Sequence, residues 1–202
     1  LGLLRKSFIP EELIRQLRTY TRLREDHIEM GSSHVQHIQK ALTSMNIRLH
    51  QVISQITGVS GMKVVKAILS GERNPEALLQ LCDKQIIKKK ATEVILSLEG
   101  YYKTEHLFAL KQAVEGYEFY EKQRLSCDAQ IDILLNQINE HLPPPTDCET
   151  FEQPQSVRHN QPKIDNLHKL LVTFTGGKDV AAISGFSDKM FLKLTAEVGN
   201  NV

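Results

Sequence analysis

Apolar residues recur every seven positions through residues 28–56, and no proline lies between Pro10 and Thr57. A heptad repeat of this length is typical of a long helix that packs along a partner helix. Proline suits the first turn of a helix and carboxylates interact favourably with its positive end, so Pro10-Glu11-Glu12 marks the expected start. We expect one helix from about residue 10 to residue 57. The two seam positions are occupied by Ile28, Val35, Ile38, Leu42, Met45, Leu49, Val52 and Ile56, which we also predict to form an interface between copies of the chain.

A second long helix is predicted from about Thr104 to His141. One heptad position holds Leu107, Val114, Leu135 and Leu142, and the other holds Leu110, Tyr117, Ile131 and Ile138. The middle of this seam is polar, because Glu121, Arg124 and Asp128 fall on it. A polar position costs stability but fixes register. Arg24 of the first helix is a candidate partner for this polar stretch; the alternative is that the stretch faces solvent.

Three short helices are predicted between the two long ones. The first runs from Ser60, a good N-cap residue, to Leu69, with Gly71 placed to end it. The second begins at Asn74-Pro75, and the third runs from about Lys84 to Leu98. Because the chain must return, the long helices should pack side by side and antiparallel, with the short helices as a cap at one end. The absence of tryptophan and an aromatic content of 6% favour an aliphatic, all-α core.

Residues 143–162 are predicted to be a linker. They hold five of the seven prolines of the chain and show no apolar periodicity. Beyond them we expect a helix from Lys163 to Phe174 and another around Asp188–Glu197. The predicted organisation is therefore a coiled-coil and helical-cap region over 1–142, the linker, and a small helical segment over 163–202. The last segment has about 40 residues, too few for an independent enzyme domain.

Composition excludes several classes of protein. The formal net charge is +1, so bulk basicity does not indicate nucleic acid. No apolar run approaches the roughly 18 residues that a membrane helix needs, and no signal peptide is recognisable. Cys82, Cys127 and Cys148 are scattered and form no C-x-x-C pair. That usage is typical of a reducing compartment, so we expect a cytoplasmic protein, and it gives no zinc signature.

Two short patterns invite a chemical interpretation, and neither supports one. Ser60 lies in Gly-Val-Ser-Gly, but the strand and the G-x-S-x-G spacing of a nucleophile elbow are missing. His34 and His37 lie three residues apart on one helix face, yet no carboxylate or cysteine at a matching offset completes a metal site. We assign no catalytic residue and no metal ligand.

Three stretches carry a resemblance to a known family, and they follow one another along the chain in the order that the family has. Residues 68–81 read Ala-Ile-Leu-Ser-Gly-Glu-Arg-Asn-Pro-Glu-Ala-Leu-Leu-Gln, between the two long helices. Residues 2–10 read Gly-Leu-Leu-Arg-Lys-Ser-Phe-Ile-Pro. Residues 179–186 read Asp-Val-Ala-Ala-Ile-Ser-Gly-Phe, and 196–199 read Ala-Glu-Val-Gly. Together they resemble the DEDD-type insertion-sequence transposases, insertion-sequence family one-hundred-ten, which are regarded as RNA-guided DNA recombinases.

The resemblance implies a fragment of a larger recombinase, which covers its middle coiled-coil region and, over residues 163–202, the N-terminal part of its C-terminal transposase domain. The family's four acidic residues, and with them its divalent metal, would precede residue 1, and its nucleophilic serine would follow residue 202. The resemblance also implies oligomers, a guide RNA and a DNA target, with no cofactor held by this segment. Gly185-Phe186-Ser187 corresponds to the family's helix-hairpin-helix-like turn, although Ser187 stands where a glycine is usual. A purely structural turn is the alternative there.

Basic side chains are the candidate nucleic-acid contacts. Arg15, Arg18 and Arg22 recur at helical spacing, and the cap region adds Lys63, Lys66, Arg73, Lys88, Lys89 and Lys90. Clusters of this kind suit phosphate, because each neutralised phosphate releases counterions. The alternative is an ordinary solvated helix face. Two functions from different classes follow: a dimerising, nucleic-acid-binding scaffold of a transposase, or a coiled-coil protein-interaction module with no nucleic-acid role.

Overall fold

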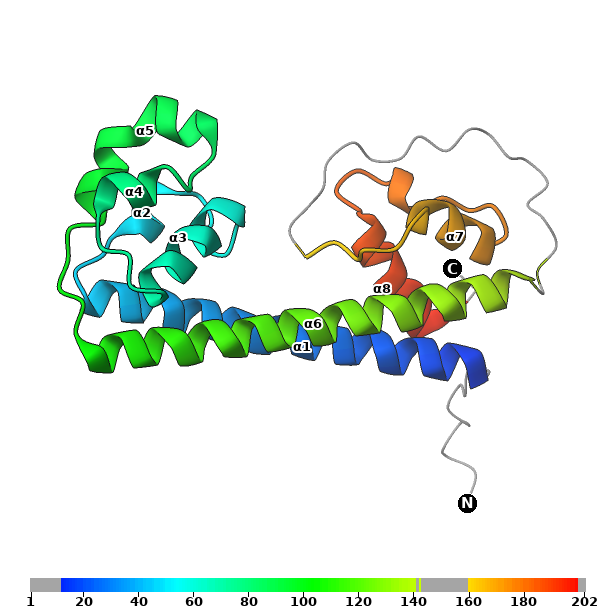
Figure 1. Cartoon of the computed structure of the whole chain (residues 1–202). Helices are drawn as coiled ribbons and strands as arrows, with labels where there is room; N and C mark the ends of the chain where they lie inside the picture. Colours follow the sequence, from blue (N-terminus) through cyan, green and yellow to red (C-terminus); the bar gives the residue numbers. More distant parts are fainter. Residues whose placement is uncertain (1–11, 141, 143–159, 200–202) are drawn as a thin grey trace, which may run out of the picture. The chain divides into compact units, whose positions relative to one another are not determined.

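The computed structural model describes residues 12–140, 142 and 160–199, and the chain divides into two compact units. Unit 1 combines the chain up to Ile28 with the chain from Glu121 onward, and unit 2 is Glu29–Tyr120. All regular secondary structure in the described ranges is helical (Figure 1), which confirms the predicted all-α class. The units differ from the predicted division at 142 and 162, because the C-terminal helices pack on the long helices within unit 1. Residues 143–159 of the predicted linker lie outside the described residues.

The two long helices are α1 (Glu12–Ser44) and α6 (Thr104–Glu140), and they pack against each other. In unit 1, Ile14 shares a hydrophobic cluster with Ile138, and Arg24 bonds to Asp128. In unit 2, a Cβ on Gly31 would lie 3.8 Å from Tyr120, and the ring of His34 lies against Gly116. In both units the residue number falls along α6 as it rises along α1. The helices are therefore antiparallel, as predicted.

Helix α1 ends at Ser44, so the prediction of one helix to residue 57 is wrong. Asn46 takes the left-handed conformation, with φ 61°. The Asn46 N–H donates to the Thr43 carbonyl at 2.9 Å, and the Ile47 N–H donates to the Leu42 carbonyl at 2.9 Å. This bond pair is the Schellman motif, which satisfies the last carbonyls of a helix. Helix α1 runs through Gly31 without interruption.

The heptad residues beyond the stop remain buried, but on other elements. Leu49 and Val52 lie on the short helix α2 (Leu49–Val52), and Ile56 lies in the turn that follows. Leu49 is 0% exposed and Ile56 is 3% exposed. Burial, not helical continuity, therefore explains why the apolar period continues past Ser44.

The cap consists of α3 (Val59–Leu69), α4 (Pro75–Leu79) and α5 (Lys84–Ser97), close to the predicted ranges. Asn74 caps α4 as predicted, since its side chain accepts a hydrogen bond from the Glu76 N–H at 2.9 Å. Gly71, with φ 106°, follows the end of α3. Ser60 is not an N-cap: Gly58 holds that position, and the Ser60 hydroxyl accepts from the Asp83 N–H at 2.9 Å. That bond joins the first turn of α3 to the start of α5.

Unit 1 is completed by α7 (Leu167–Phe174), the 3-10 turn η1 (Val180–Ala182) and α8 (Asp188–Val198). Their apolar faces pack on the N-terminal part of α1 and on the last turns of α6. The shared core contains Leu17, Ile131, Leu134, Leu135, Leu167, Leu171, Val172, Phe191, Leu192 and Ala196.

The polar stretch of α6 is paired inside unit 1, which decides between the two alternatives left by the sequence. Arg24 is 1% exposed, and its Nε donates to Asp128 Oδ1 at 2.5 Å. Arg124 Nη1 donates to the other carboxylate oxygen of Asp128 at 3.2 Å and also bonds to Glu121. The Lys163 N–H donates to Asp128 as well, at 3.2 Å. Asp128 therefore neutralises two buried guanidinium groups and holds the backbone that leads into α7.

The Asn46 stop gives a first prediction. A side chain with a Cβ in the left-handed region costs roughly 1–2 kcal/mol, whereas asparagine and glycine tolerate it. Asn46→Ala should lower the free energy of unfolding by about 1 kcal/mol. Asn46→Gly should keep or raise it. Urea denaturation followed by circular dichroism measures both, and equal stability of the two variants would contradict a left-handed helix stop.

The buried ion cluster gives a second prediction. Asp128→Ala leaves two buried guanidinium groups short of a carboxylate, so it should cost about 3–5 kcal/mol of unfolding free energy. The double variant Arg24→Met/Asp128→Leu should lose less, because no buried charge is stranded on Arg24. Asp132→Ala, one turn further along α6, is the control and should change stability by less than about 1 kcal/mol. If Asp128→Ala lowers the unfolding free energy by no more than the control does, the ion cluster is not buried as described.

Candidate nucleic-acid interface

The predicted arginine stripe on α1 is engaged within unit 1. Arg18 donates to the last carbonyls of α8, at 3.3 Å to Ala196 and 2.6 Å to Glu197. Arg22 forms a two-pronged bond with the Glu197 carboxylate, at 2.8 and 2.9 Å. Arg15 pairs with Glu12. Guanidinium groups at the negative end of a helix are favourable, so this stripe attaches the C-terminal end of α8 to α1.

The Arg22–Glu197 pair shifts the two pKa values in opposite directions, and each shift favours the charged form of its group. The hydrogen bond and charge of Arg22 lower the pKa of the Glu197 carboxyl below its ordinary value. The same contact raises the pKa of Arg22. Because the folded-state pKa of Glu197 is depressed, the contribution of the pair is present near neutral pH and is lost as the pH falls through that pKa. The pair is solvent-exposed, so its effect on stability is small.

Three of the cap cations are engaged as well. Lys66 Nζ lies 2.5 Å from Glu118 of α6. The Arg73 guanidinium lies 4.3 Å above the ring of Tyr102 and donates to the Ile68 carbonyl at 2.5 Å. Lys90 Nζ donates to the Val52 carbonyl at 2.7 Å. These contacts fix the cap helices to each other and to the long helices.

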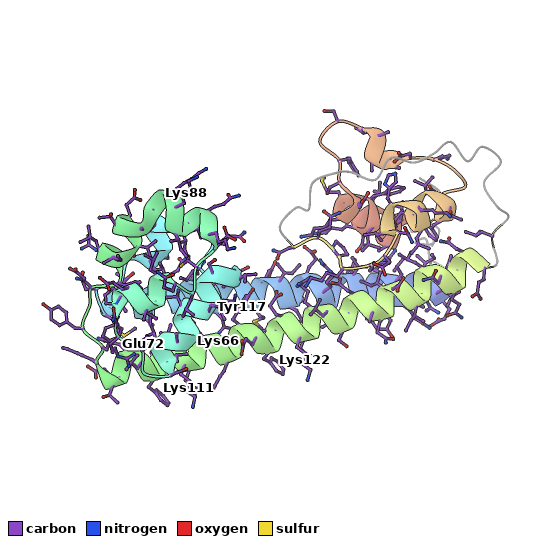
Figure 2. All side chains as sticks on the ribbon, turned by 45° about the horizontal axis from the view of Figure 1, so that its top comes forward. Lys66, Glu72, Lys88, Lys111, Tyr117 and Lys122 are labelled. Atoms are coloured by element: carbon purple, nitrogen blue, oxygen red, sulfur yellow. The ribbon has the colours of Figure 1, made fainter. Side chains whose placement is uncertain are left out.

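The remaining predicted cations, Lys63, Lys88 and Lys89, are exposed and have no ion pair among the described residues. The Ser60–Asp83 bond brings the two helices that carry them together at their N-terminal ends. Lys63 follows Ser60 by one turn. Lys84, which the sequence reasoning omitted, is exposed and precedes Lys88 by one turn. Lys63, Lys84, Lys88 and Lys89 are called the α3–α5 lysine surface below; Figure 2 shows Lys88 on the outer side of α5.

The predicted oligomer seam is largely consumed by the core of unit 2. Ile38, Leu42, Met45 and Leu49 are 0% exposed, and Val35 and Val52 are partly buried against the same core. Ile28, in unit 1, is half-buried. These side chains leave little apolar surface for a second chain. The exposed apolar residues of unit 2 lie elsewhere. They include Met30, Phe108 and Phe119 on the long helices, and Val59, Leu96 and Tyr101 in the cap region and its connection to α6.

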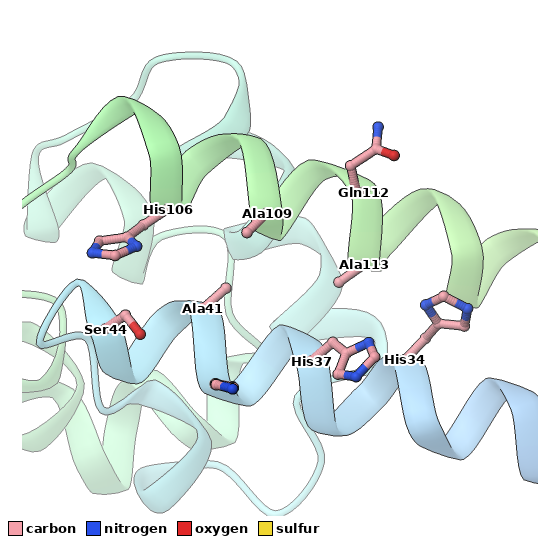
Figure 3. Close-up of a pocket in the computed structure, with 9 residues that line it drawn as sticks. His34, His37, Ala41, Ser44, His106, Ala109, Gln112 and Ala113 are labelled. Atoms are coloured by element: carbon pink, nitrogen blue, oxygen red, sulfur yellow. The ribbon is translucent and has the colours of Figure 1, made fainter.

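A groove in unit 2 brings together the histidines that the sequence singled out. It encloses about 590 Å³ between α1 and α6 and is lined by His34, His37, Lys40, Ala41, Ser44, His106, Ala109, Gln112 and Ala113 (Figure 3). The rings of His34 and His37 meet edge-on, with centroids 5.8 Å apart. His34 also stacks on Tyr120 at 5.5 Å. No group of three or more histidine, cysteine or carboxylate residues in the described ranges is placed to hold a metal ion.

Gly116 lies inside α6, where a glycine lowers the stability of the helix. A Cβ there would lie 2.3 Å from Cε1 of His34, which no real contact permits. Glycine inside a helix costs about 1 kcal/mol relative to alanine. The missing side chain makes room for the imidazole of His34, whose Nδ1 is buried with no hydrogen-bond partner among the described residues. The sequence signal was a lone glycine amid an otherwise helix-forming stretch.

The C-terminal turn is capped and paired internally. Ser187 caps α8 by accepting from the Met190 N–H at 3.4 Å, and Gly185 has φ 88°. Asp188 is 4% exposed, and its Oδ1 lies 2.8 Å from Nδ1 of the buried His168. Nε2 of the same histidine lies 3.4 Å from Asp179. This arrangement favours the structural interpretation of the turn.

No protein-family model, no curated protein and no solved structure matches this chain significantly. Within the described residues, no helix combines the length and the apolar character needed to cross a membrane.

A third prediction concerns the glycine in the long helix α6. Gly116→Ala should lower the free energy of unfolding by about 1–3 kcal/mol, because the new methyl group displaces His34. Gly31→Ala, in α1, is the matched control: its Cβ would meet nothing closer than 3.8 Å. That control should gain up to about 1 kcal/mol.

Removing the imidazole tests the cause. In the double variant His34→Ala/Gly116→Ala the clash is absent, so stability should exceed that of Gly116→Ala with a clear coupling energy. If the two substitutions have additive effects in urea denaturation, the stability loss in Gly116→Ala does not come from a clash with His34.

Proposed function

We propose that this chain is the middle coiled-coil region and the start of the C-terminal domain of an insertion-sequence transposase of the DEDD type. It would serve DNA transposition or recombination as a dimerisation and nucleic-acid-binding scaffold without its own active site. The observation that carries the proposal is the ordered set of three stretches at 2–10, 68–81 and 179–199. Their order matters because one short motif alone has little specificity.

The fold around the middle stretch supports this assignment. Residues 68–81 include the end of α3, the Gly71 turn and all of α4, and they lie in the cap that joins the two long helices. The Asn74-Pro75-Glu76 portion is used as an N-cap, a first-turn proline and a first-turn carboxylate. The stretch is thus a structural signature of a helical tip, which suits a scaffold better than a catalytic site.

The α3–α5 lysine surface is the part of the chain that we propose to contact guide RNA or DNA. Its four lysines are exposed on two helices that the Ser60–Asp83 bond joins at their N-terminal ends, and no ion pair engages them among the described residues. When lysines without internal ion pairs neutralise phosphates, the counterions condensed on the nucleic acid are released, which favours binding. Arg15, Arg18, Arg22, Lys66, Arg73 and Lys90 are not proposed as contacts, because each is engaged within its unit.

The remaining attributes follow from the same family assignment. We propose a cytoplasmic protein that acts as a homodimer or higher homo-oligomer. Divalent metal and the reacting groups would belong to other portions of the transposase, and this segment would hold no cofactor. Self-association would use exposed apolar side chains such as Phe108 and Phe119, since the heptad seam is buried.

The fourth prediction tests the lysine surface. The chain should bind duplex DNA or structured RNA weakly at low salt, with affinity falling steeply as salt rises. Replacing Lys63, Lys88 and Lys89 by glutamine should weaken binding for all sequences alike. The slope of log K against log salt should fall by about 2–3, near 0.9 for each duplex phosphate contact. Fluorescence anisotropy at several salt concentrations measures both quantities.

The matched control uses engaged cations. Lys66→Gln/Arg73→Gln removes two positive charges from the same unit, but both are paired within it, so the salt slope should stay near that of the parent. Equal losses in the two variants would indicate a nonspecific charge effect. If the parent chain does not bind at low salt, the protein-interaction module becomes the better description.

A further inference from the structure

We infer that the groove between α1 and α6 in unit 2 is a binding pocket for a single unpaired nucleotide, in which the base lies on the alanine floor and the phosphate meets the cationic wall. This inference rests on the proposed function, because it names a further contact between the same scaffold and nucleic acid. It concerns other residues than the α3–α5 lysine surface.

The charge of the lining is one-sided. Three imidazoles and one ammonium group line the groove, from His34, His37, His106 and Lys40, and no carboxylate is among the lining residues. Each imidazole can present an N–H donor and Lys40 adds an ammonium group, so the groove favours an anion over a cation. The described ranges contain no three-ligand cluster that could hold a metal ion.

The shape and polarity of the lining favour a planar, partly apolar ligand over a bare anion. Ala41, Ala109 and Ala113 project between the two helices (Figure 3), which leaves a flat apolar floor. Flat rings are stacked by histidine and tyrosine side chains in single-strand recognition. The volume of about 590 Å³ falls within the range of pockets for small organic ligands.

Two neutral polar residues, Gln112 and Ser44, also line the groove. The Gln112 amide has both donors and an acceptor, and the Ser44 hydroxyl can do either. The two lie on opposite walls, one on α6 and the other on α1. A base offers both donors and acceptors to such groups, whereas phosphate offers mainly acceptors, so the two ligands differ in the hydrogen bonds they can make here.

The histidine wall is preorganised. Gly116 gives up a side chain to admit His34, and stacking on Tyr120 together with the edge contact to His37 orients the two rings. Orientation of a binding group before the ligand arrives lowers the entropy cost of binding. Core packing alone gives no reason for a half-buried imidazole with an unsatisfied nitrogen at this position.

The test uses the whole chain with three probes: adenosine 5′-monophosphate, a five-nucleotide single-stranded RNA, and inorganic phosphate. Histidine imidazole proton signals, assigned through His34→Ala, His37→Ala and His106→Ala, report on the groove directly by NMR. The mononucleotide and the RNA should shift the signals of His37 and His106. Phosphate should shift them much less at the same concentration.

Two variants localise the binding. His37→Ala removes a stacking ring and should weaken mononucleotide binding about tenfold. Ala109→Leu fills the groove from an exposed position, so it should abolish binding while circular dichroism and thermal unfolding remain those of the parent. The triple glutamine variant of Lys63, Lys88 and Lys89 should bind the mononucleotide as the parent does.

The outcomes separate this inference from the proposed function. If lysine-dependent duplex binding survives but no nucleotide shifts the histidine signals, the pocket inference is overturned and the proposed function stands. Equal shifts with phosphate and nucleotide would also overturn it, since an anion site would suffice. If raising the protein concentration shifts the signals together with an increase in mass by light scattering, the groove is occupied by a second copy. If the histidine signals respond to nucleotide but the lysine variant binds duplex like the parent, the pocket holds and the lysine surface does not.

Discussion

The antiparallel packing of α1 on α6 is the interaction on which both hydrophobic cores depend. In unit 2 it presents Ile38, Leu42, Leu110 and Val114 to the cap helices. In unit 1 it presents Leu17, Ile131 and Leu135 to α7 and α8. Short helices of 4 to 14 residues such as α2 and α5 are marginal alone, so their stability comes from this apolar wall. Substitutions that separate the long helices should therefore disturb the short helices before any candidate site is affected.

The heptad pattern identified the long helices and their orientation but not where the first one stops. A period-seven pattern reports which residues are buried, and Leu49 and Ile56 are buried although they lie beyond the helix. The stop is set by Asn46, whose left-handed conformation is a local signal that the apolar pattern outweighed. Arg24 shows the converse. The sequence offered it as a candidate partner for the polar stretch of α6, and it does bond to Asp128 there.

The basic residues show why charge patterns overpredict binding surfaces. Helical spacing placed Arg18 and Arg22 correctly on one stripe, but their partner, Glu197, lies about 175 positions away in sequence. Lys66 and Arg73 likewise meet Glu118 and Tyr102, which no local pattern identifies. Separating binding cations from structural cations requires the tertiary contacts. What remains is a smaller set, Lys63, Lys88 and Lys89, extended by Lys84.

The two units also share a local device that periodicity does not reveal. A similar five-residue pattern stands at the start of α3 and before α8. It reads Ile56-Thr57-Gly58-Val59-Ser60, whose last two residues belong to α3, and Ile183-Ser184-Gly185-Phe186-Ser187, which ends just before α8. Both helices have 11 residues. Counted from the serine, four buried positions coincide: Gly61, Val64, Val65 and Ile68 in α3, and Asp188, Phe191, Leu192 and Thr195 in α8. Helix α8 buries Ala196 in addition. Lys66 and Lys193 occupy the same place in the pattern, and each pairs with a glutamate of a long helix within its own unit.

Each unit thus presents a short turn with glycine and serine and then docks an 11-residue helix by the same four positions. The turns differ in their caps: Gly58 leaves the first N–H groups of α3 without a side-chain acceptor, whereas Ser187 supplies one for α8. The local sequence therefore sets how each helix docks, and the capping residue sets how much of its positive end is already neutralised. In unit 2 that less neutralised end lies beside Lys63 and the start of α5, so backbone and side chains add to the same positive surface.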